Sequence, residues 1–176
     1  MTRDEFWQLI DEARPPDDDG FEIAERLREL LEQRSLEVVQ GFASEQGRVM
    51  EESYSLALWG AAHLANGGAD DDEFERFRGW LLTRGREAFE RVVEDPDALV
   101  DFLPPGEKAE CEQMLYVAAL AHEAVTGDFP EGPQFHMPNL GKGFDFDDAN
   151  EMQTRYPRLW ARRGLGSPSP SPAPGD

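Results

Sequence analysis

The chain has 176 residues, of which 37 are Asp or Glu and 17 are Lys or Arg, so its formal net charge at pH 7 is −20. A chain of this length is most simply one domain, since domains commonly contain roughly 100–200 residues. Nucleic acids and anionic membranes bind proteins through Lys and Arg, so the negative charge argues against both as partners. A single cysteine, Cys111, excludes an intrachain disulfide framework and a zinc site built on several thiolates. No membrane-length apolar run and no signal peptide is present, so we expect a soluble cytoplasmic protein.

The predicted elements begin with an amphipathic helix at the N-terminus. Thr2 and Glu5 have the spacing of a capping box, in which each satisfies a backbone amide of the other. We expect this helix to end at Arg14, because Pro15 disfavours helical backbone in the residue before it. A second helix is predicted over residues 21–31, where apolar residues recur at helical spacing.

The next predicted segment opens after Ser35, a suitable N-cap residue. Glycine weakens a continuous helix, so we expect a break near Gly47. The most apolar helix is predicted from Met50 to Ala65 and should be central. Gly67 and Gly68 follow it, and glycine readily adopts the left-handed backbone that ends a helix.

An acidic run, Asp70–Asp72, precedes a predicted helix over residues 73–93. Carboxylates are favoured at helix N-termini by capping and by the macrodipole. A short helix should open at Pro96, because proline suits the first helical position. A long final helix is predicted from Glu107 to Thr126, with Gly127 ending it.

Beyond Gly127 the chain becomes rich in proline, glycine and aromatic residues, and we expect residues 128–148 to wrap the helices as an ordered coil. Leu159 and Trp160 should anchor the end by burial. Residues 167–176 form a Ser/Pro tail that cannot contribute to a core. The fold class predicted is all-α: a compact single-domain bundle of about five to seven helices over residues 1–166, with an irregular Pro/Gly-rich C-terminal wrap.

Several blocks of this sequence resemble a known bacterial family. They are DEFWQLIDEA, LWGAAHLANGGADDDEFERFRGWLLTRGREAFE, EDPDALVDF and the closing FDFDDANEMQTRYPRLW. Their order and spacing are similar to domain-of-unknown-function family 4240 (DUF4240), most strongly over residues 1–105. The resemblance implies a small soluble protein and no established activity. The residues that carry it are Trp7, Trp59, Gly67, Gly68, Asp71, Asp72, Phe74, Phe77, Arg78, Trp80, Gly85 and Pro96.

The acidic run is the sharpest candidate for chemistry. Carboxylate oxygens suit Mg²⁺ or Ca²⁺, but ligands must converge on the ion, and consecutive aspartates do not converge by themselves. No DxDxDG-type calcium loop is present. The alternative is that one aspartate caps the following helix while the others face solvent. We therefore predict neither a metal ligand set nor a cofactor.

Histidine and cysteine offer little further chemistry. No HExxH motif occurs, and a metal held jointly by His63 and His122 would require their two helices to face each other. His63 also stands where relatives often carry an aromatic residue, so the resemblance implies no family-wide role for it. Cys111 is about three turns from His122 on the same predicted helix, so no local base would activate its thiol. No catalytic residues are assigned.

Two hypotheses of function remain. The first is a non-enzymatic acidic helical module that binds a basic protein partner, as an immunity protein or antitoxin does, since complementary charge steers association. The alternative is a metal-dependent hydrolase or small-molecule enzyme that uses Asp71, Asp72 and His63. An aromatic residue exposed beside the Gly67–Asp72 loop would mark the binding site. The candidate binding residues are Trp59, His63, Gly67, Gly68, Asp71, Asp72, Phe77, Arg78 and Trp80.

Overall fold

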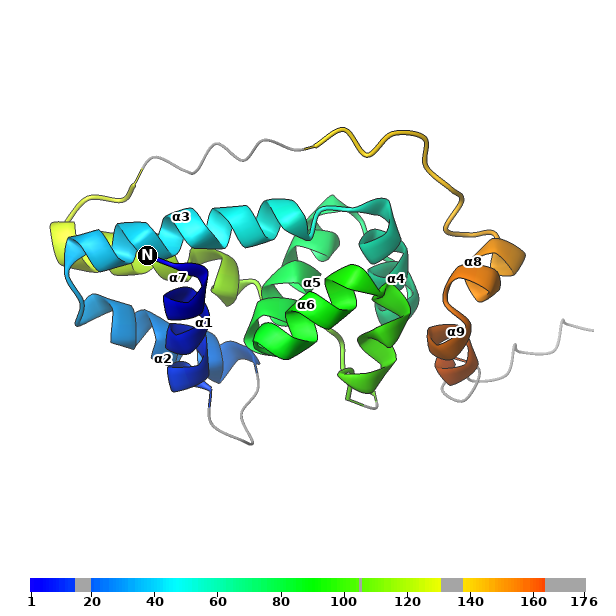
Figure 1. Cartoon of the computed structure of the whole chain (residues 1–176), viewed down its shortest axis with the longest axis horizontal. Helices are drawn as coiled ribbons and strands as arrows, with labels where there is room; N and C mark the ends of the chain where they lie inside the picture. Colours follow the sequence, from blue (N-terminus) through cyan, green and yellow to red (C-terminus); the bar gives the residue numbers. More distant parts are fainter. Residues whose placement is uncertain (15–19, 105, 131–137, 164–176) are drawn as a thin grey trace, which may run out of the picture.

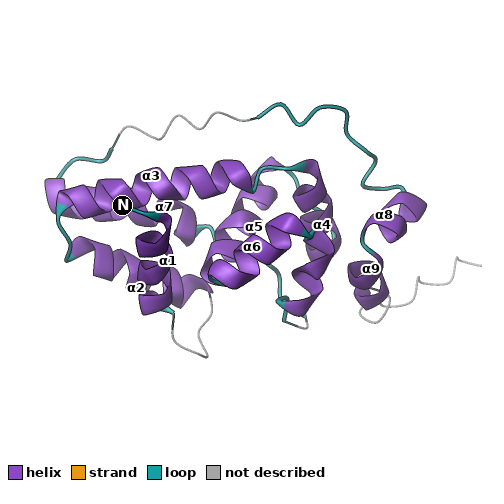
Figure 2. Cartoon of the chain, in the orientation of Figure 1, coloured by secondary structure: helices purple, strands orange, loops and turns teal. Residues whose placement is uncertain are grey.

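The structure, a computed structural model, describes residues 1–14, 20–104, 106–130 and 138–163 (Figure 1). Every regular element in these ranges is a helix and none is a strand, which confirms the all-α class (Figure 2). The elements in chain order are α1 (Arg3–Ala13), α2 (Gly20–Glu32), α3 (Leu36–Glu52), α4 (Leu56–Asn66), α5 (Asp71–Thr83), α6 (Arg86–Glu94), the 3₁₀ helix η1 (Pro96–Asp101), α7 (Gln113–Thr126), α8 (Ala149–Arg155) and α9 (Pro157–Arg163).

The predicted caps are confirmed where a short local pattern defines them. Thr2 and Glu5 form the reciprocal capping box of α1, and Arg14 is its C-cap. Gly67 ends α4 in the left-handed conformation, with φ of 76°. Gly127 ends α7 in the same way, with φ of 81°.

The break predicted near Gly47 is wrong. α3 continues through both Gly41 and Gly47 to Glu52, because Phe42 and Val49 of this helix are buried in the core. Tertiary packing of that kind outweighs the roughly 1 kcal/mol propensity cost of a helical glycine. The apolar helix α4 starts only after Ser55, whose hydroxyl accepts a hydrogen bond from the Leu58 amide at 3.1 Å.

The segment over residues 73–93, predicted as one helix, is two helices. Gly85 separates α5 from α6 with φ of 84° and ψ of 177°, a backbone region that is essentially restricted to glycine. The guanidinium of Arg14 donates a hydrogen bond to the Arg84 carbonyl and lies where a Cβ on Gly85 would be. This contact joins the C-cap residue of α1 to the turn.

The last long helix begins six residues later than predicted, at Gln113 instead of Glu107. The preceding chain makes specific bonds of its own. Asn66 donates to the Ala109 carbonyl at 3.2 Å and accepts from the Ala109 amide at 2.9 Å, and Cys111 donates its amide to Arg76 at 2.9 Å. These bonds hold the segment against α4 and α5 in an extended form.

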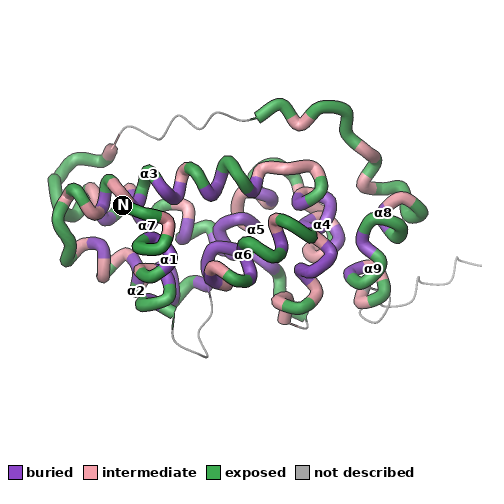
Figure 3. Tube along the Cα trace, viewed as in Figure 1, coloured by how far each residue is buried: buried purple, intermediate pink, exposed green. Residues whose placement is uncertain are grey.

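The helices pack around one continuous apolar core (Figure 3). α2 packs most extensively on α7, α3 also lies against α7, and α1 packs on α2. At the other end of the molecule, α4 contacts α5, η1 and α9. No described helix is long and apolar enough to cross a lipid bilayer.

The C-terminal helices α8 and α9 return to the α4 end of the molecule, far from the end of α7 (Figure 1). Met152, Tyr156 and Leu159 are buried there, and Trp160 is partly buried. The Asp97 carboxylate in η1 accepts hydrogen bonds from the Arg158 and Leu159 amides at 3.0–3.2 Å. Part of the predicted coil, residues 131–137, and the predicted tail from residue 167 lie outside the described residues.

Candidate functional site

Trp59 is a partly exposed aromatic residue directly beside the Gly67–Asp72 loop. Its indole N–H donates a hydrogen bond to the Ala69 carbonyl at 2.9 Å. Its ring stacks on Phe74 of α5, with centroids 4.9 Å apart and planes within 9°. A ring held from two sides keeps one orientation, so Trp59 is a fixed aromatic ring beside this loop, partly buried and not fully exposed.

Only one of the three aspartates in the loop has a structural role. Asp70 is the N-cap of α5: it accepts from the Glu73 amide at 2.8 Å, and Glu73 accepts from the Asp70 amide at 3.0 Å. Asp71 and Asp72 are exposed, and neither side chain makes a hydrogen bond or ion pair with another described residue. Gly67 and Gly68, both at positive φ, turn the chain from α4 into the loop whose Ala69 carbonyl is bonded to Trp59, two residues before Asp71.

The C-terminal segment brings a second group of side chains to the same place. The Phe146 ring lies 6.3 Å from the Trp59 ring and 5.4 Å from the His63 ring, centroid to centroid. Asp147, which is almost fully exposed, has a carboxylate oxygen 3.9 Å from Nε2 of His63. Sequence reasoning missed Phe146 and Asp147, although the FDFDD stretch already carried the family resemblance.

We call this surface the Trp59 site and define it by Trp59, His63, Asp71, Asp72, Phe146 and Asp147. It combines aromatic rings with carboxylates from two segments that are about 75 residues apart in the chain. Such a combination suits a cationic side chain, because both ring faces and carboxylates attract positive charge.

The other predicted binding residues lie beneath this surface and not on it. Phe77 is fully buried and Trp80 is 3% exposed. Arg78 is 4% exposed and lies between two rings, with its guanidinium carbon 5.0 Å from the Tyr54 centroid and 4.9 Å from the Phe74 centroid. Phe77 and Arg78 contact Phe74, on which Trp59 stacks, and Trp80 in turn contacts Phe77.

Arg78 is held by few polar contacts for a buried cation. Its Nη1 donates to the Met50 carbonyl at 2.7 Å, its Nη2 is 3.8 Å from Glu75, and its Nε has no hydrogen-bond partner among the described residues. Burial lowers the pKa of Arg78 from its ordinary value, and Glu75 opposes that shift. The contacts tie α5 to the end of α3.

The histidines and the cysteine lie at separate places. His63 is in the Trp59 site, whereas His122 lies near the end of α7, with Nδ1 3.1 Å from the Asp128 carbonyl oxygen. Cys111 is buried and donates its S–H to the Gly20 carbonyl at 3.3 Å. Within the described ranges, no three His, Cys, Asp or Glu side chains come together as a set of metal ligands.

Comparison with known proteins gives one match. A protein-family model described as "Protein of unknown function (DUF4240)" matches residues 1–124. No curated protein and no solved structure matches the chain. The matched range includes Trp59 and the acidic loop but ends before Phe146 and Asp147, so the Trp59 site draws residues from inside and outside it.

Proposed function

Because this chain belongs to the DUF4240 family, for which no function is established, we propose its function from its own surface. The protein is a non-enzymatic acidic module that binds a basic protein partner. One observation carries this proposal: Trp59 is partly exposed and is fixed by the Ala69 carbonyl, in the loop that leads directly into the exposed residues Asp71 and Asp72. An immunity- or antitoxin-like role, in which the partner is a basic toxin domain, is its most concrete form.

The chemistry of recognition follows from the parts of the Trp59 site. A Lys or Arg side chain of the partner can lie against the Trp59 ring, an interaction of about 0.5–1 kcal/mol at an exposed position. The neighbouring carboxylates pair with the same cation. The net charge of −20 adds long-range attraction, which raises the association rate of a basic partner and weakens with salt.

A defined probe tests the proposal before any natural partner is known. We would titrate the protein with a peptide of Arg, Gly and Ser, which has no apolar side chain, by calorimetry at low and high ionic strength. Asp71→Asn with Asp72→Asn should weaken binding roughly three- to tenfold, because each exposed charge pair contributes about 0.2–1 kcal/mol. Binding of the parent protein should be lost at high salt.

The matched control removes the same charge elsewhere. Glu29→Gln with Glu87→Gln alters two exposed residues on α2 and α6, outside the Trp59 site. If the two double variants weaken binding equally, the affinity for the peptide depends on net charge alone and the Trp59 site is not the binding surface. If the parent protein does not bind the peptide at low salt, the proposed function itself is wrong.

A further inference from the structure

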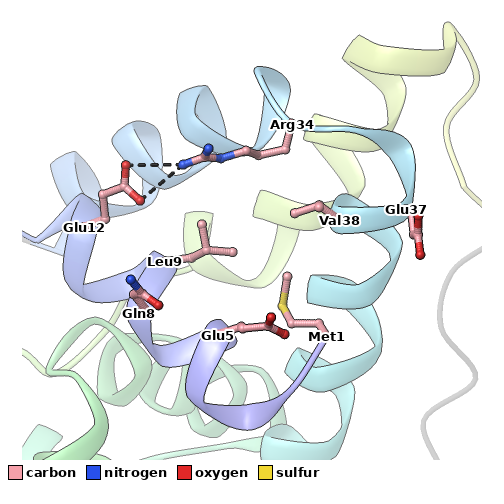
Figure 4. Close-up of a pocket in the computed structure, with 8 residues that line it drawn as sticks. All are labelled: Met1, Glu5, Gln8, Leu9, Glu12, Arg34, Glu37 and Val38. Carbon is pink, nitrogen blue, oxygen red and sulfur yellow. Dashed lines mark hydrogen bonds and ion pairs between the residues drawn. The ribbon is translucent and has the colours of Figure 1, made fainter.

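A second concave surface lies between α1 and α3, and none of its lining residues belongs to the Trp59 site. It is a cleft of about 520 Å³ (Figure 4). Leu9 of α1 and Val38 of α3 point toward each other across it, and the Met1 side chain extends into the space between them. These three apolar side chains form the floor of the cleft.

Carboxylates dominate the rim of the cleft. Glu5 and Glu12 project from α1, and Glu37 lies at the outer edge on α3. Two positive charges belong to the lining residues, the guanidinium of Arg34 and the N-terminal ammonium group of Met1. Arg34 has its Nη2 3.3 Å from both carboxylate oxygens of Glu12, so its charge is already paired. The hydrogen bonds to Thr2 lower the pKa of Glu5 and keep this carboxylate charged.

We infer that this α1–α3 cleft is a docking site for a basic amphipathic helix of a partner protein. The inference rests on the proposed function, because it assumes a basic protein partner. It adds that this partner presents an amphipathic helix. An amphipathic helix places its apolar face in a groove between helices and leaves its polar flanks at the rim. Here an apolar side chain would cover Leu9 and Val38, and Lys or Arg on the flanks would meet Glu5 and Glu37.

Charge complementarity selects this occupant over a second copy of the same chain. Two copies would each carry a charge of −20, and the acidic rim would face further negative charge. A neutral apolar helix would fill the floor but would bring no positive charge to the acidic rim.

The test uses a synthetic amphipathic helix of about 15 residues with leucines along one face and lysines elsewhere. Binding to the full-length protein would be measured by calorimetry. Val38→Ser replaces one of the three apolar side chains of the cleft floor with a polar one. Val38 is only partly buried, and the substitution should weaken binding about tenfold. Tyr116→Ser is the control, because it removes a larger exposed apolar side chain from α7 that does not line the cleft.

Circular dichroism would confirm that both variants fold. Selective weakening by Val38→Ser supports the docking site. Equal affinity of the parent protein and Val38→Ser, or equal weakening by both variants, overturns it.

The Arg/Gly/Ser peptide distinguishes failure of the docking site from failure of the proposed function. If that peptide still binds in a manner that depends on Asp71 and Asp72, only the α1–α3 cleft is ruled out. A parent protein that does not bind the amphipathic helix also rules the cleft out.

Discussion

Tyr156 joins the C-terminal helices to α4 through one buried hydroxyl group. Its O–H donates to the Ala57 carbonyl at 2.7 Å, and its ring lies beside Phe144. Gly60 makes room for this contact, because a Cβ at that position would meet both the Tyr156 hydroxyl and the Phe144 ring. A buried phenol favours its neutral form, and burial raises the pKa of Tyr156 to about 12.

We predict that Tyr156 makes the protein sensitive to alkaline pH. The folded state holds the phenol proton more tightly than the unfolded chain, in which tyrosine titrates near 10. The stabilisation is therefore complete below pH of about 10 and is lost as pH rises through about 12. Urea unfolding at pH 8 and pH 11 should show a smaller loss of stability in Tyr156→Phe than in the parent protein.

The control for this prediction is Tyr116→Phe, at a tyrosine exposed on α7. It should show the same alkaline loss as the parent protein. At pH 8, Tyr156→Phe should cost about 0.5–1.5 kcal/mol for the lost hydrogen bond. An alkaline loss of equal size in Tyr156→Phe and the parent protein would contradict the prediction.

At the scale of the helices, local signals predicted caps well and breaks poorly. The capping boxes of α1 and the left-handed glycines after α4 and α7 depend on neighbouring residues alone, so a sequence is sufficient to find them. Gly47 and Gly85 are both preceded and followed by helical residues, yet only Gly85 breaks the chain. Gly85 adopts a backbone conformation that is essentially restricted to glycine, and the turn contacts Arg14, about 70 residues away, which no local pattern reveals.

The turn between α5 and α6 should therefore be costly to alter. Gly85→Ala places a side chain at φ of 84° and forces the Arg14 guanidinium to move, so we expect a loss of about 2–4 kcal/mol in the free energy of unfolding. Gly67→Ala is the control for an uncrowded glycine at positive φ: its φ is 76° and its ψ is 27°, in the left-handed helical region, and no atom lies within 4 Å of the added Cβ. It should cost only about 1–2 kcal/mol.

A double-mutant cycle with Arg14→Ala isolates the collision from the backbone strain. In the Arg14→Ala background, the cost of Gly85→Ala should fall but should stay above that of Gly67→Ala, because alanine tolerates the backbone of Gly85 less well than the left-handed helical backbone of Gly67. An unchanged cost in that background would show that the collision with Arg14 does not contribute to it.

At the scale of the whole molecule, the sequence predicted the class of fold, and it had already named Trp59, His63, Asp71 and Asp72 among the candidate residues that we group in the Trp59 site. Trp59 and the acidic loop are close in the chain, so adjacency along the sequence was enough to associate them. Phe146 and Asp147 reach the site only because α8 and α9 dock on α4 and η1. That docking depends on contacts between segments far apart in the chain, such as Asp97 with the Arg158 and Leu159 amides.

Asp97 makes this docking testable. Its largely buried carboxylate caps the start of α9, so Asp97→Asn keeps the size of the side chain but replaces one accepting oxygen with an amide that cannot accept. We expect a loss of about 1–2 kcal/mol, as for other helix caps, concentrated in the C-terminal helices. Hydrogen exchange should accelerate over residues 149–163 and remain unchanged in α2 and α7.

Asp101→Asn removes the same charge from η1 and serves as the control. Asp101 pairs at the exposed surface with Arg91 and Arg158, and exposed ion pairs contribute only about 0–1 kcal/mol. Acceleration along the whole chain in Asp97→Asn would mean that the C-terminal helices unfold only with the rest of the protein. Acceleration confined to residues 149–163 would mean that Phe146 and Asp147 can leave Trp59 while the bundle stays folded, because α8 directly follows these two residues in the chain.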